Sequence, residues 1–219
     1  MKRYIMLAAL FSAFYLSASF AQAQEALWQN SYQLEKAGKY TEAIAAIAPI
    51  AVNSPDAELK VMRRGWLYYL LGSYNESIRE YRLAIDRNNK SIDARLGLTL
   101  PFIAQQRWRE VEINARAALE LAPNNYIALI RLAIAEEGQH DWNGMKKTSN
   151  TLVINYPSDA NAFVYLARAE AGSGKRDEAI AAYIAVLSRY PGHLEATAYL
   201  KKNNVLALNN LANTKCKAD

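Results

Sequence analysis

Residues 160–193 read ANAFVYLARAEAGSGKRDEAIAAYIAVLSRYPGH. Two stretches rich in apolar and small residues are separated by Gly172-Ser173-Gly174, and Pro191 follows the second stretch. Helices end at glycine and proline, so this segment predicts two helices joined by a short turn. No strand-like alternation of apolar and polar residues competes with the helical interpretation.

The same pattern recurs along the chain with a period of 34 residues. Asn89 stands where one proline is missing, and Gln106 and His140 stand where the turn glycine is missing. Each period therefore predicts two helices of about 12 to 14 residues. The markers in register are Pro55, Pro123, Pro157 and Pro191, the glycines Gly38, Gly72 and Gly174, and the aromatic residues Tyr40, Tyr74, Trp108 and Trp142 that follow the turn.

This period resembles that of the tetratricopeptide repeat family, whose motif is W-x2-L-G-x2-Y, then A-x3-F, then P. The second repeat matches best, through Gly65, Tyr68, Tyr81 and Ala84, whereas the first has Asn30 and Ser31 where leucine and glycine are usual. The resemblance implies an all-α fold, a right-handed superhelical solenoid of helix-turn-helix repeats with a C-terminal capping helix. The fifth repeat supplies Phe163, Leu166, Ala167, Ala179, Tyr183 and Pro191 in motif positions.

The N-terminus has the pattern of a secretory signal peptide. Lys2 and Arg3 precede a run without charge, and small residues follow it, so cleavage is expected after Ala23. An uncleaved membrane anchor is the alternative, but the run is short for a span of roughly 20 residues. We therefore expect a periplasmic or secreted protein with no integral membrane span in the mature chain. The expected organisation is a signal peptide at 1–23, five repeats at 24–57, 58–91, 92–125, 126–159 and 160–193, and a capping helix with a flexible tail at 194–219.

Composition argues against several functions. The 26 basic and 21 acidic residues become 24 and 21 without the leader, a charge of +3, and they are intermixed, so nucleic acid is not expected as a partner. One cysteine and two histidines leave no pattern for a metal, a cofactor or a catalytic group, so we expect no enzyme. Glu76, Glu80, Glu136 and Glu137 read as solvated helix faces. Cys216 reads as a free tail thiol or as the site of an intermolecular disulfide.

Pro101 lies inside the expected first helix of the third repeat. A proline there removes one backbone hydrogen bond and clashes with the preceding turn, so we expect a local bend of that helix.

The resemblance also implies a concave groove lined by first-helix side chains that do not pack on the second helix. Aromatic residues and arginines are frequent at binding hot spots, and an arginine can hold a carboxylate with two hydrogen bonds. The expected lining is Trp28, Tyr32, Met62, Arg63, Trp66, Tyr69, Leu96, Leu100, Ile103, Ile127, Ile130, Arg131, Ile134, Asn161, Tyr165 and Arg168.

Several hypotheses remain for this face. The preferred one is a scaffold that holds a protein or peptide segment of the cell envelope, with the arginines binding acidic groups. The runner-up is a peptidoglycan or glycan-binding module that stacks sugar rings on the aromatic side chains, and self-assembly is third. Alternatively, the apolar stripe is helix packing, or the C-terminal segment fills the groove. The sequence leaves the oligomeric state open.

Overall fold

The computed structural model describes residues 22–205, and all regular secondary structure in this range is helical. The leader, except for its last two residues, and the tail with Cys216 lie outside the described residues. The chain divides into two compact units after Pro101. In the first unit, helical residues 22–36 precede α2 (Tyr40–Ala46), α3 (Ala57–Leu70) and α4 (Tyr74–Arg87), and α5 (Ile92–Ala104) begins there. The second contains α6 (Trp108–Leu121), α7 (Tyr126–Gly138), α8 (Trp142–Asn155), α9 (Ala160–Gly172), α10 (Arg176–Arg189) and α11 (Leu194–Lys202).

The two helices of each pair are joined by a turn with one residue in the left-handed conformation. Gln106 and His140 have φ of 55° and 57°, so they adopt the conformation that glycine supplies in the other turns. The next backbone N–H then donates to the carbonyl five residues earlier, as from Arg107 to Phe102, which closes the end of the first helix. The predicted turns are thus confirmed, including the two without glycine. The glycines with positive φ are Gly38, Gly72 and Gly174.

The first pair departs from the expected helix length. Helix α2 has 7 residues, whereas α4, α6, α8 and α10 have 14 each, so the prediction of a helix of 12 to 14 residues is wrong here. Pro49 explains the early end, because it has no N–H and disfavours helical geometry at Ala48. The buried Lys60 ammonium compensates by donating to the carbonyls of Ala48 and Ile50, at 2.8 and 2.6 Å.

Helix α5 continues through Pro101, with the proline inside it. Because Pro101 has no backbone N–H, it cannot donate the usual helical hydrogen bond to the carbonyl of Gly97, one turn earlier. Gly97 also lies tightly against the ring of Tyr81, because a Cβ there would come within 2.2 Å of that ring. A bend of the α5 axis stays a prediction.

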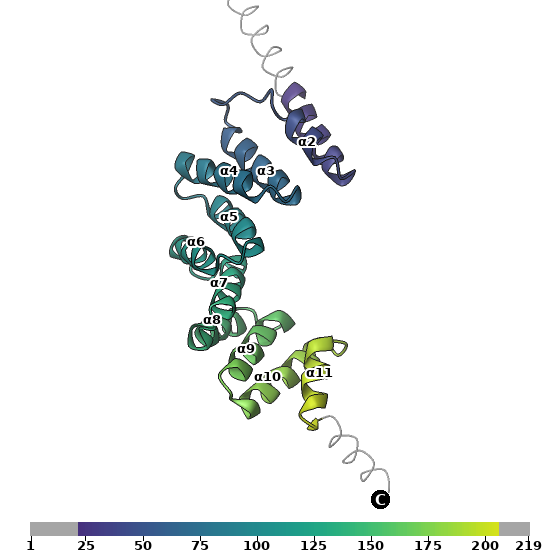
Figure 1. The fold of residues 1–219 in the computed structure, drawn as a ribbon, viewed down its shortest axis with the longest axis vertical. Helices are drawn as coiled ribbons and strands as arrows, with labels where there is room; N and C mark the ends of the chain where they lie inside the picture. The colour runs from purple at the N-terminus through teal and green to yellow at the C-terminus, as the bar shows by residue number, and fades with distance from the viewer. Residues whose placement is uncertain (1–21, 206–219) are drawn as a thin grey trace, which may run out of the picture. The chain divides into compact units, whose positions relative to one another are not determined.

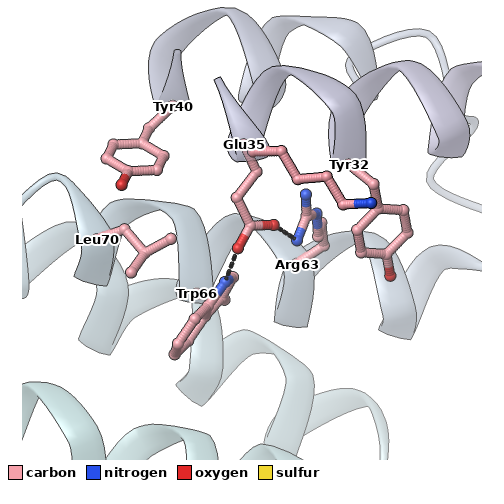
Figure 2. A pocket seen from close by; sticks show the side chains of 7 residues that line it. Tyr32, Glu35, Tyr40, Arg63, Trp66 and Leu70 are labelled. Carbon is pink, nitrogen blue, oxygen red and sulfur yellow. Dashed lines mark hydrogen bonds and ion pairs between the residues drawn. The ribbon is translucent and has the colours of Figure 1, made fainter. Parts of the chain in front are cut away.

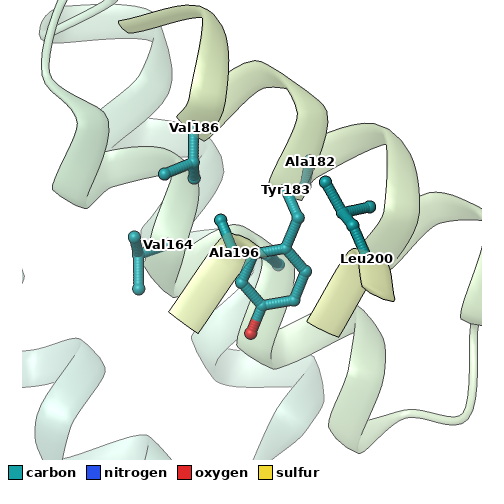
Figure 3. Close-up of a cluster of buried hydrophobic side chains, with 7 residues drawn as sticks. Val164, Ala182, Tyr183, Val186, Ala196 and Leu200 are labelled. Carbon is teal, nitrogen blue, oxygen red and sulfur yellow. The ribbon is translucent and has the colours of Figure 1, made fainter. Parts of the chain in front are cut away.

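Small residues let the helices approach closely around buried aromatic side chains. Figure 3 shows the cluster in which Tyr183 of α10 lies among side chains of α9 and α11. Figure 1 shows the same helices packed together, with α11 against α10. Helix α11 therefore covers the apolar face that α9 and α10 would otherwise expose. The buried members of the cluster are Val164, Ala167, Ala182, Tyr183, Val186, Ala196 and Leu200.

The first helices of successive pairs are capped by side chains at the same repeat position. Asn125 Oδ1 accepts from the N–H of Ala128 at 2.9 Å, and His193 Nδ1 accepts from the N–H of Ala196 at 3.3 Å. Such caps satisfy N–H groups that have no partner within the helix. His193 is thus the N-terminal cap of α11, and His140 lies in a turn. Ser91 and Asp159 are the other capping residues in this register.

A glycine at the strained turn position should stabilise the protein. Replacing Gln106 by glycine removes the cost of a left-handed non-glycine residue, so we expect Gln106→Gly to raise the free energy of unfolding by about 1 kcal/mol. Ala104→Gly, on the helical side of the same turn, should lower it by about 0.5 to 1 kcal/mol. Urea unfolding of both variants measures these changes. Equal destabilisation by both would show that the left-handed backbone at Gln106 carries no cost.

Candidate functional site

A cleft of about 520 Å³ opens in the first unit, between the first helix pair and α3. Figure 2 shows Tyr40, Leu70 and Trp66 on one side of it and Tyr32 on the other, with Glu35 and Arg63 between them. Tyr32 is 46% exposed, and Trp66 and Tyr40 are half-buried, so aromatic surface faces the cleft from both sides. The residues lining the cleft are Tyr32, Glu35, Lys36, Tyr40, Arg63, Trp66 and Leu70.

The Glu35 carboxylate joins the first helix pair to α3. One oxygen accepts from a guanidinium nitrogen of Arg63, and the other accepts from the indole N–H of Trp66 at 2.7 Å (Figure 2). Hydrogen bonds to an ionised group are stronger than neutral ones and fix geometry. The carboxylate therefore holds the Trp66 ring in one orientation at the wall of the cleft.

Arg63 was predicted to bind an acidic ligand, but the structure pairs it with the chain itself. Its Nε donates to the Ser31 hydroxyl at 3.3 Å, its Nη2 donates to the Ser31 carbonyl at 3.1 Å, and its guanidinium lies 4.0 Å from the centre of the Tyr32 ring. Only 6% of Arg63 is exposed. A buried arginine needs internal partners, and Arg63 has them from Glu35 and Ser31. Its guanidinium is therefore a structural clamp, and the prediction is corrected.

The remaining charge of the cleft is that of Lys36. Arg63 neutralises Glu35, and Lys36 is exposed with no ion pair to any described residue. The charged groups that line the cleft thus leave one net positive charge at its rim.

At the junction of the first and second repeats, Leu70 stands where two later junctions have a glycine. In the second unit the ring of Trp108 lies flat on Gly138, where a Cβ would come within 2.4 Å of the ring, and Trp142 lies likewise on Gly172. Two periods upstream of Trp108 and Gly138, Tyr40 and Leu70 occupy these positions and line the open cleft. Tyr40, Leu70, Glu35 and Lys36 were not among the predicted residues. The available sequence signal for this site was Leu70, which stands at the repeat position that Gly138 and Gly172 occupy later in the chain.

The aromatic surface continues from the cleft along α3 onto α4. The rings of Trp66 and Tyr69 lie 5.6 Å apart between their centres, and those of Tyr69 and Tyr74 lie 6.1 Å apart. All three residues are half-buried, so each ring packs on one side and is open on another. The structure thus brings together four of the predicted groove residues, Tyr32, Arg63, Trp66 and Tyr69.

Trp28 is a core residue, which corrects its assignment to the groove. It is 7% exposed and packs with Ile47 and Ile50, and its indole N–H donates to Asp56 at 3.1 Å. The non-helical segment after α2 folds back over this ring, which explains its burial.

The other predicted residues of the first unit lie outside the cleft. Met62 packs against Val61, Ala84 and Ala94, and Leu96 and Leu100 are half-buried on α5. None of these three residues lines the cleft.

In the second unit two of the predicted residues take part in packing between helices. Ile130 and Tyr165 pack against the cluster of Leu129, Leu152 and Ala162, whereas Ile127 is 44% exposed. The apolar stripe is thus partly helix packing, as the alternative interpretation held. Ile103, Arg131 and Ile134 are half-buried, and Asn161 is exposed.

Arg168 also pairs with the chain itself. Its Nε and Nη2 donate to the two oxygens of Glu195 at 2.9 and 2.6 Å, and its Nη1 donates to Glu137 at 3.3 Å. The Arg168 guanidinium and the Tyr183 hydroxyl hold the pKa of Glu195 below its usual value, against the effect of burial. These contacts tie α11 to α9. The prediction that Arg168 serves a ligand is therefore corrected to a structural role.

Among residues 22–205 three glutamates are buried, including two that were expected on solvated faces. Glu80, Glu136 and Glu170 each pair with a base, Arg64 at 2.9 Å, Arg116 at 3.2 Å and Lys146 at 2.7 Å respectively. The second oxygen of each carboxylate accepts no hydrogen bond from the described residues. Burial with incomplete pairing makes the charged form costly. For Glu136 burial raises the pKa to about 7, although the Thr148 hydroxyl and Arg116 act to lower it.

The raised pKa of Glu136 predicts a pH-dependent stability. The folded protein holds a proton that the unfolded chain releases near pH 4.5, so this stabilisation is complete below pH 4.5 and is lost as the pH rises to about 7. The change is on the order of 3 kcal/mol. Glu136→Gln should remove this slope, and Glu120→Gln, an exposed residue of the same unit, should keep it. Chemical denaturation from pH 4 to pH 8 measures the slope; parallel profiles of wild type and Glu136→Gln would contradict the prediction.

Residues 22–205 offer no candidate for a metal site or a membrane span. No cluster of three or more metal-ligating side chains occurs among these residues. Nor does any helix there have the length and apolar character needed to span a bilayer.

Comparison with known proteins agrees with the helical pairs. Residues 161–193 match the family model described as tetratricopeptide repeat. MamA from Desulfovibrio magneticus RS-1 superimposes with a TM-score of 0.69 at 13% identity, over 78% of this chain and 97% of that one. YrrB, described as a TPR protein with an unusual peptide-binding site, gives 0.68 at 15% identity over 86% and 98%. A tetratricopeptide repeat protein from Parabacteroides merdae gives 0.73 at 15% identity over 87% and 76%. Among curated proteins, none matches the sequence. The fold is therefore the all-α tetratricopeptide solenoid.

Proposed function

We propose that this protein is a non-catalytic scaffold that binds a segment of a protein partner at the cleft of its first unit. The observation that carries the proposal is the cleft itself, with aromatic rings on both sides and Trp66 held by Glu35. Partly exposed aromatic side chains in a concave, rigid site are the usual anchors of protein interfaces. The fold supports the same function, since tetratricopeptide proteins typically hold protein partners.

We further propose that the partner belongs to a bacterial envelope assembly. The support comes from the sequence, in which Lys2 and Arg3, an uncharged run and the small residues up to Ala23 have the order of a cleavable leader. The mature chain would then meet its partner in the periplasm or outside the cell.

A glycan ligand finds less support in the geometry. The rings expected to stack on sugars are those of Trp28, Tyr32, Trp66 and Tyr69. Trp28 is buried in the core and Trp66 and Tyr69 are half-buried, so Tyr32 is the exposed ring of the set. Titration with soluble wall fragments distinguishes the two functions, because a protein-binding cleft predicts no saturable binding of glycan.

Affinity capture tests the proposed function. The chain from Gln24 onward is used to capture proteins from envelope and cytoplasmic extracts, together with a Tyr32→Ala/Tyr40→Ala variant that removes aromatic surface from both sides of the cleft. Loss of two aromatic anchors commonly costs about 2 kcal/mol or more, so we expect the partner to come from the envelope extract and to be lost at least 10-fold by the variant.

Ile154→Ala serves as the matched control, because Ile154 is 77% exposed on α8 and lies outside the cleft. This variant should capture the partner as the wild type does, and circular dichroism should show that both variants are folded. Unchanged capture by the folded double variant would refute the assignment of the cleft.

A further inference from the structure

The charges of the cleft restrict the chemistry of its ligand. A basic ligand would have to compete with Arg63 for the Glu35 carboxylate, whose two oxygens already accept hydrogen bonds from Arg63 and Trp66. It would also approach the ammonium of Lys36, which no described acidic side chain neutralises. An acidic ligand meets neither obstacle, and a carboxylate is attracted by the one net positive charge at the rim.

The apolar wall restricts the ligand in a second way. In the second unit the space between the corresponding positions is closed, because Trp108 and Trp142 lie directly on glycines. In the first unit Tyr40 and Leu70 stand on one side of an open space with Trp66 beside them (Figure 2). An apolar side chain from a partner can fill this space, which would bury the exposed apolar surface of Tyr40, Leu70 and Trp66.

We propose that the segment bound here is acidic and carries one bulky apolar side chain. The apolar side chain lies against Tyr40, Trp66 and Leu70, and a neighbouring carboxylate pairs with Lys36. This inference rests on the proposed function and names the chemical class of its partner. The exposed ion pair between Lys36 and the ligand carboxylate contributes modestly to the affinity, and its contribution depends on ionic strength. Burial of the apolar side chain supplies most of the affinity.

Fluorescence anisotropy with three labelled peptides tests the inference. The first is a short acidic peptide with a central phenylalanine, the second has alanine at the centre, and the third has glutamine and asparagine in place of every glutamate and aspartate. We expect the alanine peptide to bind at least 10-fold more weakly than the first. The amide peptide should bind about 3- to 10-fold more weakly at low salt, with the difference shrinking at high salt.

Two lysine variants separate the local charge from the general charge of the protein. Lys36→Met keeps the aliphatic stem, and it should reduce the difference between the acidic and amide peptides to less than 2-fold. Lys39→Met removes an exposed lysine that does not line the cleft, and it should preserve the difference. Amide and acidic peptides that bind equally to the wild type, or a difference that survives Lys36→Met, would overturn the inference.

The outcomes also separate this inference from the proposed function. If no peptide binds while capture of the partner still depends on Tyr32 and Tyr40, the acidic and apolar class is wrong and the cleft remains the binding site. If no peptide binds the wild type or the double variant, and the double variant captures the partner as the wild type does, both proposals fail.

Discussion

Each helix pair can bury its apolar face only against pairs one period away in sequence, and this nearest-neighbour constraint governs the rest of the structure. Hydrogen bonds between pairs show it directly, since Trp66 reaches back 31 residues to Glu35, Tyr126 reaches forward 33 to Asp159, and Arg189 reaches back 32 to Pro157. An array of this kind is stabilised by contacts between adjacent repeats. A pair at the start of the described array has a described neighbour on one side only, and it is there that the shortened α2 and the cleft occur.

The constraint also explains why charged residues have structural roles. Arg63 binds a glutamate of the adjacent repeat, Arg168 binds a glutamate of the adjacent capping helix, and Lys60 binds carbonyls of the segment that follows α2. A charge at such a junction is buried when the neighbouring helix packs on it, so it needs a partner from that helix. Among the described charged side chains that line the cleft, Lys36 is the one without an ion pair, so the proposed binding depends on the aromatic rings of the cleft more than on the arginines.

Much of the fold could be predicted because the turn geometry repeats in the sequence. The 34-residue spacing placed the turns at Gln106 and His140 although neither is glycine, and both have positive φ. The site was harder to predict, because motif positions say which residues lie on a first helix but not which neighbour they meet. Trp28 is buried by a segment that Pro49 removes from α2, and Arg63 meets a glutamate 28 residues earlier. Neither contact follows from helical periodicity. The substitution of Leu70 for a junction glycine was visible in the sequence, but its effect required the packing of Trp108 on Gly138 for comparison.

The proposed place of the protein partner is the cleft of the first unit. A photoreactive amino acid in place of Tyr40, compared with the same group in place of Ile154, tests it most directly. A partner bound in the cleft should give a cross-link from position 40 to one of its acidic segments, and none from position 154. A partner that cross-links from position 154 and not from position 40 would contradict it.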